Sequence, residues 1–193
     1  MSSVVISGDT SGAITVSAPA VAGTNTLTLQ AATATNSVNT LGTAVASTSG
    51  TSIDFTGLPS WIKKITVMFR GVSTSGTSGN LIQLGTSGGI VSTGYVSTGI
   101  RVTNASATGG LSSTAGFVFG SITAADLISA VVQICLIDTN TWVCSFSGKS
   151  TTAMAFLGGG DVALGGTLDR VRITTVNGTD TFDAGTVNIL YEG

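Results

Sequence analysis

The stretch WIKKITVMFRGVSTSGTSGNLIQLGTSGGIVSTGY, from Trp61 to Tyr95, decides the fold of this chain. In its segment 65–70, Ile, Val and Phe alternate with Thr, Met and Arg, and this period of two predicts a strand with one buried face. A Ser/Thr/Gly turn leads to the apolar run 81–84, and Gly88-Gly89 leads to a further strand from Ile90. Three strands joined by two Gly-rich turns predict an antiparallel meander.

The composition of the whole chain supports a β protein with many polar turns. Its 193 residues include 24 serines, 32 threonines and 27 glycines, and only 8 % are charged, against about 25 % in a typical soluble domain. Thr favours strands, whereas Ser and Gly favour turns. Short alternating runs of Val, Ile, Leu and Phe argue against a disordered chain.

The distribution of charge speaks against several classes of partner. The formal net charge is -2, and Lys63-Lys64 is the only basic pair. Nucleic acids and anionic membranes attract a basic face, so we expect neither as a partner. No apolar run approaches the length of a membrane span, and the first residues do not resemble a secretory signal. Because so little charge repels neighbouring copies, we expect the chain to function as part of an assembly.

The chain divides into three predicted parts. Residues 1–35 contain three very short strands with few large side chains, and we interpret them as a β arm for oligomerisation or attachment. Residues 36–50 are read as a linker or weak strand. Residues 51–193 contain about ten strands separated by turn residues, which predicts an all-β, antiparallel sandwich of jelly-roll type. Within it, Val171 and Ile173 are expected to point inward, and Val187, Ile189 and Tyr191 are expected to share one face.

The run 131–146 predicts a hairpin that carries both cysteines. A tight loop at Thr139-Asn140 places Cys135 directly opposite Cys144, on the same face as Trp142. The sequence therefore predicts two cross-strand thiols, free in a reducing cytoplasm and able to form a disulfide later.

The residue types argue against catalysis. The chain has no His, which removes the commonest general base and metal ligand and makes a Ser-His-Asp triad impossible within one chain. A glycosidase pair among its nine acids remains open. The clusters Gly158-Gly159-Gly160 and Gly165-Gly166 lack the context of a phosphate loop and are read as tight turns. We expect no enzyme activity and no cofactor.

Two ligand sites remain candidates. Asn177, Asp180 and Asp183 offer oxygen atoms to a Ca²⁺ ion, although a solvated turn is favoured because no EF-hand pattern is present. Trp61, beside two lysines, is a candidate aromatic for stacking on a sugar, whereas Trp142 is expected in the core.

Three stretches resemble known proteins. The segments GDTSGAITVSAPAVAGTNTLTLQAATAT (Gly8–Thr35), Ile53–Tyr95 with GLPSWIKKITVMF, LIQLG and TGY, and LDRVRITTVNGTDTFDAGTVNILYE (Leu168–Glu192) cover about half of the chain. They resemble tail-fibre-like and other virion proteins of tailed bacteriophages, notably phages of marine and freshwater bacteria. The resemblance implies an externally displayed, usually trimeric, β-rich virion protein, and it carries over no functional residue.

The combined expectation is a non-enzymatic structural protein on the surface of a bacteriophage virion, assembled in the host cytoplasm. The chain lacks the long shaft and anchor domain of a tail fibre, which favours a trimeric capsid decoration (cement) protein or short head fibre that contacts other virion proteins. A tail fibre or receptor-binding tip is the alternative, with a host surface glycan as its ligand. A carbohydrate-binding jelly-roll module is the second alternative, and a polysaccharide-cleaving enzyme the third.

Overall fold

The computed structural model describes residues 3–7, 13–17, 38–103, 107–120, 123–124, 126–151 and 153–193, in which it contains sixteen strands and no helix. Contacts divide the chain into two units, Met1–Asn36 and Ser37–Gly193. In the first unit, β1 (Ser3–Ser7) and β2 (Ala13–Ser17) form an antiparallel hairpin. The third strand predicted for the arm, near Leu27, lies outside the described residues.

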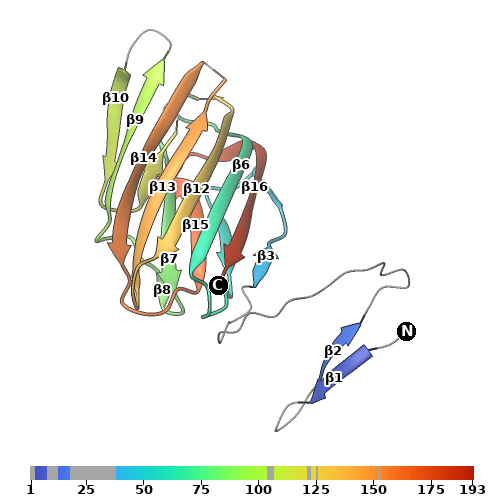
Figure 1. Ribbon diagram of the computed structural model, residues 1–193. Helices are drawn as coiled ribbons and strands as arrows, with labels where there is room; N and C mark the ends of the chain where they lie inside the picture. The colour runs from blue at the N-terminus through green and yellow to red at the C-terminus, as the bar shows by residue number, and fades with distance from the viewer. Residues whose placement is uncertain are drawn as a thin grey trace. The chain divides into compact units, whose positions relative to one another are not determined.

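The second unit is an antiparallel β-sandwich, which confirms the predicted fold class. The larger sheet has nine strands in the order β10-β9-β14-β13-β12-β6-β16-β3, with β4 also pairing β16. Its strands are β3 (Asn39–Leu41), β4 (Val45–Ala46), β6 (Lys64–Thr74), β9 (Val96–Thr103), β10 (Ala107–Ser113), β12 (Ile128–Leu136), β13 (Thr141–Lys149), β14 (Met154–Ala163) and β16 (Phe182–Glu192). Figure 1 shows most of them side by side.

The smaller sheet packs behind the larger one in the view of Figure 1. It has five strands in the order β11-β7-β15-β5, with β8 pairing β7. Its strands are β5 (Ile53–Thr56), β7 (Asn80–Thr86), β8 (Gly89–Ile90), β11 (Phe117–Phe119) and β15 (Arg170–Thr175).

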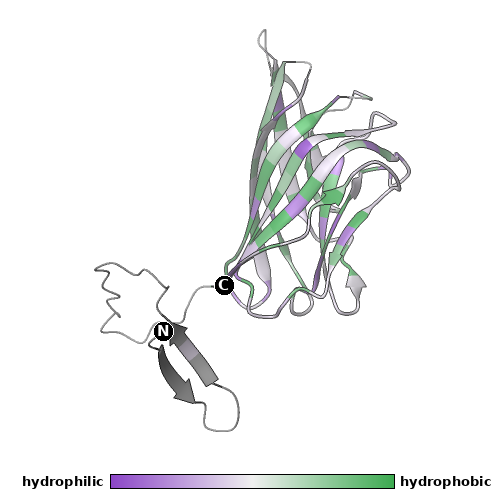
Figure 2. Cartoon of the chain, turned by 90° about the vertical axis from the view of Figure 1, so that its right-hand side faces the viewer, coloured by the Kyte–Doolittle hydropathy of each residue, from purple (hydrophilic) through white to green (hydrophobic). Residues whose placement is uncertain are grey.

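The core lies between the two sheets and follows from the alternation of each strand. Val132 and Ile134 of the larger sheet are fully buried, as are Val171 and Ile173 of the smaller one. Phe119 joins the layers, because its ring packs edge-on against Phe69 at 5.0 Å and also contacts Phe146 and Phe156. Figure 2 shows hydrophobic residues recurring along the strands of the sandwich. The buried faces predicted for 65–69 and 171–173 are confirmed, and Val187 and Ile189, predicted to share a face, are both buried in the core.

The predicted meander of Trp61–Tyr95 is only partly correct. Strands β7 and β8 form the expected hairpin, but β6 and β7 belong to different sheets. Strand β6 already pairs β12 on one side and β16 on the other, so no edge is left for β7. The turn between them crosses the end of the sandwich, where the backbone N–H of Ser78 donates to Asp180 Oδ2 at 3.0 Å.

The described part of the segment 36–50, residues 38–50, is part of the sandwich rather than a linker. Strands β3 and β4 both pair with β16. Ser47 is completely buried, and its hydroxyl donates to the carbonyl of Ala184 at 2.8 Å. The weak-strand alternative for this segment is therefore the correct one.

The strand order does not establish a jelly roll. Strands β12, β13 and β14 follow one another in the chain and are direct neighbours in one sheet. That is the connectivity of a meander, whereas a jelly roll is wound from two Greek keys.

Candidate functional site: the outer face of the nine-stranded sheet

The outer face of the larger sheet is built by strict alternation along its central strands. In β12 and β13, Val132 and Cys144 point into the core, while Val131 and Val143 point outward and are 45 % and 39 % exposed. Strands β9 and β14 continue the pattern, with Ile100 and Leu157 outward. The face therefore spans strands that are far apart in the sequence.

The registers align these outward residues into rows across the sheet. One row, called here the aliphatic row, runs through Gly110, Ile100, Leu157, Ser147, Val131 and Met68 on β10, β9, β14, β13, β12 and β6. The next row on the same strands, called the polar row, runs through Ser112, Thr98, Gly159, Ser145, Gln133 and Thr66. Neither row contains a charged residue.

Charges lie only in the rows that flank these two. Lys149 of β13 stands beyond the aliphatic row, in register with Ala155. Asp161 of β14 stands beyond the polar row, in register with Val143 and Val96. Val96 is 68 % exposed, the largest value among the exposed apolar side chains of the described residues. The middle of the face is therefore uncharged. One margin carries Lys149 and the exposed Arg70 of β6, and the other carries Asp161 together with the Lys64–Glu192 ion pair.

Glycines on the inner side of the same strands keep this part of the sheet close to the Phe146 ring. A Cβ atom on Gly158 would lie 2.5 Å from Phe146 Cζ and would also collide with the carbonyl oxygen of Thr98. A Cβ atom on Gly99 would lie 2.9 Å from the same ring carbon. The cluster 158–160 is therefore a strand segment in β14, and its prediction as a tight turn is wrong.

The smaller sheet presents a different outer face. Arg172 makes a bidentate ion pair with Asp54 on the neighbouring strand, at 2.7 and 2.9 Å. The side chain of Gln83 donates to the carbonyl of Ala115 at 2.9 Å. Leu81 is only 2 % exposed, because the backbone at Gly116 lies against it. This face is thus charged and is covered in part by the chain itself.

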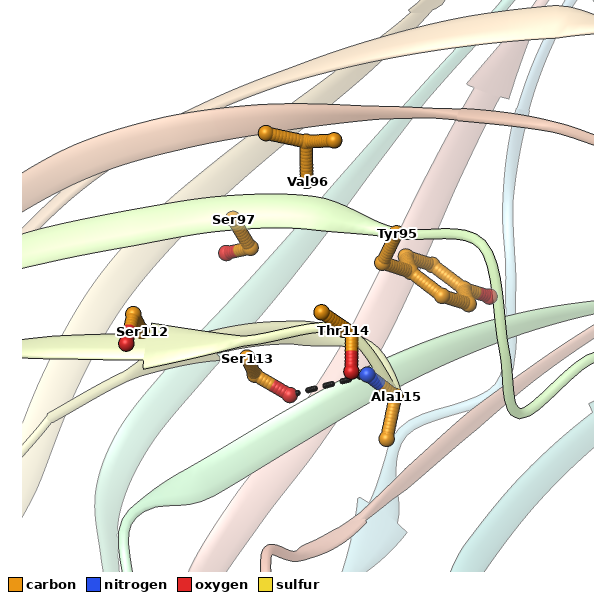
Figure 3. Close-up of a pocket in the computed structure, with 7 residues that line it drawn as sticks. All are labelled: Tyr95, Val96, Ser97, Ser112, Ser113, Thr114 and Ala115. Atoms are coloured by element: carbon orange, nitrogen blue, oxygen red, sulfur yellow. Dashed lines mark hydrogen bonds between the residues drawn. The ribbon is translucent and has the colours of Figure 1, made fainter.

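A shallow hollow of about 500 Å³ lies where β9 begins and β10 ends (Figure 3). Three of its polar side chains are engaged with nearby backbone. Tyr95 Oη accepts from the N–H of Leu84 at 2.7 Å, Ser97 Oγ accepts from Val118 at 3.0 Å, and Ser113 Oγ accepts from Ala115 at 3.0 Å. Burial raises the pKa of Tyr95 to about 12. These polar groups therefore stabilise the junction of the strands and do not form an acid–base pair.

The predicted pairing of the two cysteines is wrong. Cys144 lies opposite Ile134 and Cys135 lies opposite Val143, so the register differs by one residue from the prediction. Cys144 therefore points into the core, whereas Cys135 lies on the outer face, and both thiols are free. Burial raises the pKa of Cys144 to about 12.

The cause of this register is the loop between β12 and β13. Asp138 Oδ1 accepts hydrogen bonds from the backbone N–H groups of Asn140 and Thr141, at 3.3 and 3.1 Å. Hydrogen bonds from Thr141 and Asn140 also hold the pKa of Asp138 below its ordinary value. Ile137 then pairs with Thr141, which gives a three-residue loop in place of the expected two-residue loop.

The other predicted ligand residues are found in local structural contacts. Asn177 Nδ2 donates to Asp180 at 2.6 Å, and Asp183 accepts from the hydroxyl of Ser73. Within the described residues, no three acidic or other metal-ligating side chains come together. Trp61 is 38 % exposed, and its ring lies against Tyr191 with the centroids 5.8 Å apart. Beside it, Lys64 and Glu192 form an ion pair at 2.8 Å that raises the pKa of Lys64.

Sequence reasoning missed the aliphatic row, which becomes visible only when the strand registers are known. It also missed Arg101, which points inward and is 8 % exposed. No known protein family, curated protein or solved structure matches this chain. In the described part of the chain, no helix is long and apolar enough to cross a membrane.

Proposed function

We propose that this chain is a non-catalytic structural protein of a bacteriophage virion, displayed on the particle surface as a capsid decoration protein or short head fibre. The observation that carries the proposal is the uncharged, partly aliphatic outer face of the larger sheet, which suits burial against protein. The resemblance of the segments Gly8–Thr35, Ile53–Tyr95 and Leu168–Glu192 to virion proteins supplies the setting.

The chemistry of the surface supports a role in contact rather than in catalysis. In the hollow, the hydroxyls of Tyr95, Ser97 and Ser113 accept hydrogen bonds from backbone N–H groups. The two rows in the middle of the larger face carry uncharged groups only: hydroxyl, amide and aliphatic groups and the thioether of Met68. Such a surface binds through apolar and hydrogen-bonding contacts, which salt screens weakly.

Localisation on the particle tests the proposal. Gold-labelled antibodies against the purified chain, applied to virions whose genome encodes it, are expected to mark the capsid. Labels at the tail tip would support the alternative of a tail fibre or receptor-binding tip. Absence of the chain from purified virions would reject the proposal.

A salt wash tests the nature of the attachment. Virions washed from low to roughly molar salt should retain the chain, because surface ion pairs are the contacts that salt weakens most. Release of most of the protein by salt alone would contradict attachment through apolar and hydrogen-bonding contacts.

We further propose that residues 1–35 associate the chain into a trimer. Small residues in this arm, such as Gly12 and Ala13, allow three backbones to approach closely, and copies of the arm cover the exposed edges of its short strands. Deletion of residues 2–35 should reduce the mass in solution by a factor of three and leave the circular dichroism of the sandwich unchanged. An unchanged mass would assign the trimer contacts to the sandwich.

A further inference from the structure

We infer that the outer face of the nine-stranded sheet is an interface with a second copy of this chain, in which two such faces pack antiparallel about a twofold axis. The inference rests on the same face as the proposed function and deepens it, because it names a second copy of the chain as the protein that covers this face; it is independent of the arm. It rests on the size of the face, on the position of its charges and on the order of its rows.

The face is large enough for a stable contact. It is eight strands wide, and strands spaced ~4.8 Å apart give a width of ~34 Å. The four rows from Lys149 to Val143 cover about 20 Å at ~3.3 Å per residue. The resulting area of roughly 700 Å² is close to the ~800 Å² per partner that specific interfaces bury.

The middle of the face has the composition of an interface core. Leu157 is 53 % exposed and Ile100 is 41 % exposed, and they are direct cross-strand neighbours with Val131 two strands away. Residues with charge are depleted at interface cores, and the aliphatic and polar rows contain none. A contiguous exposed surface of this kind marks a contact site.

A twofold contact requires that the face be complementary to itself. Consider a twofold axis that lies midway between two facing sheets, runs perpendicular to the strands and passes between the aliphatic row and the polar row. Rotation about this axis places the aliphatic row of each copy over the polar row of the other. Leu157 then lies over Gly159 of the second copy, and Ile100 lies over its Thr98. Leu157 and Ile100 therefore meet smaller residues, which allows close packing of this part of the two sheets at about 10 Å.

The charges select this axis. The same rotation carries the row of Lys149 over the row of Asp161, which stand on neighbouring strands. Each Lys149 therefore reaches Asp161 of the second copy, and the contact contains two such ion pairs. Arg70 falls over the Lys64–Glu192 ion pair of the second copy, in which the two charges cancel. An axis along the strands, centred between β13 and β14, would instead set each Lys149 beside its own counterpart. Like charges in contact disfavour that arrangement.

The mass of the full-length chain in solution tests the contact. Sedimentation over a range of concentrations should give a copy number that is a multiple of two, and Leu157→Lys should halve it. Val176→Lys is the matched control, because Val176 is 52 % exposed and lies beyond the end of β15, away from this face. A wild-type copy number of one or three at all concentrations, or an unchanged mass for Leu157→Lys, would overturn the inference.

A charge reversal tests the orientation. Lys149→Glu and Asp161→Lys should each raise the dissociation constant of the contact by about threefold to tenfold, and the double reversal should restore it. Failure of the double variant to recover would reject the antiparallel arrangement. Deleting residues 2–35 should leave this twofold contact intact, so loss of the arm's trimer and loss of the face contact are distinguishable.

Cysteine labelling gives an independent readout. Cys135 lies on this face, whereas Cys144 is buried inside the same sheet. A small alkylating reagent should label Cys135 several-fold faster in Leu157→Lys than in the wild-type chain, while Cys144 stays unlabelled in both. Equal labelling rates of Cys135 in the associated wild-type chain and in the variant would contradict burial of the face.

Discussion

The two sheets of the sandwich share one core but differ in the charge and exposure of their outer faces. On the smaller sheet, Arg172 and Asp54 form an ion pair, and the chain near Gly116 covers Leu81. On the larger sheet, Leu157 stands half exposed in a surface whose two middle rows have no charge. The smaller face is thus completed in part by its own chain, whereas the middle of the larger face is left uncovered by the described residues.

Two leucines give the sharpest test of this contrast. Leu81→Ala should lower the free energy of unfolding by about 2–5 kcal/mol, because it leaves a cavity beneath Gly116. Leu157→Ala should change it by less than about 0.5 kcal/mol at concentrations where the chain is a single copy. Urea unfolding followed by circular dichroism measures both. Similar losses at the two positions would show that the larger face is also covered within one copy.

A glycine substitution tests how the larger sheet is held from inside. Gly158→Ala should cost about 1–3 kcal/mol, because the new methyl group meets the Phe146 ring and the backbone of β9. Gly165→Ala is the control, since nothing lies within 4 Å of an added Cβ atom there and the change should stay within about 0.5 kcal/mol. Thermal unfolding of the two variants separates the outcomes. A neutral Gly158→Ala would mean that the ring and sheet can move apart freely.

Alkaline pH tests the opposite placement of the two cysteines. Burial raises the pKa of Cys144 from 9.0 to about 12, so above pH 9 the unfolded chain loses a proton that the folded chain keeps. Stability is fully present below pH 9 and should fall by about 2 kcal/mol by pH 10.5, at 1.36 kcal/mol per pH unit. Tyr95, whose pKa is raised from 10.0 to about 12, adds to the fall at higher pH.

The contribution of the thiol is isolated by two variants. Cys144→Ala should flatten the decline of unfolding free energy between pH 9 and 10.5, whereas Cys135→Ser retains the buried thiol and should keep the decline. Identical pH profiles of the unfolding free energy for the two variants would contradict the conclusion that Cys144 is buried and Cys135 is not.

The smallest expected effect concerns the charged face. Arg172→Met should cost about 0.2–1 kcal/mol at low salt, as exposed ion pairs do, and less at high salt. Ser145→Ala in the polar row should change stability by less than about 0.5 kcal/mol, equally at both salt concentrations. If salt changed the effects of Arg172→Met and Ser145→Ala equally, the contrast between a charged smaller face and an uncharged larger face would be contradicted.

Much of the fold is predictable from the period of two. The alternation in β6, β15 and β16 identifies their inward residues because each strand has one face in the core. The sheet that receives each strand was not predictable, as the separation of β6 from β7 shows. Strand partners are chosen by contacts between segments distant in sequence, which local patterns do not report.

The candidate site was predictable only in its composition. The low charge of the chain is evident from the sequence, but Ile100, Leu157 and Val131 come from three separated segments. Their alignment depends on registers, and a register depends on details such as the Asp138 hydrogen bonds that lengthen the loop after β12. A difference of one residue there moves a side chain to the other face.

The position of β16 has a consequence for the order in which the chain is made. Strand β16 pairs with β6 along nine residue pairs and also pairs with β3 and β4. Strands β3, β4 and β6 are synthesised before β16, so they cannot form these pairings until β16 has been synthesised. Until residues 182–192 leave the ribosome, one edge of β6 is unpaired and the larger sheet is incomplete. Long-range pairing of this kind slows folding and exposes strand edges to other chains. Nascent chains on crowded ribosomes would therefore benefit from a chaperone that shields β6 until synthesis reaches β16.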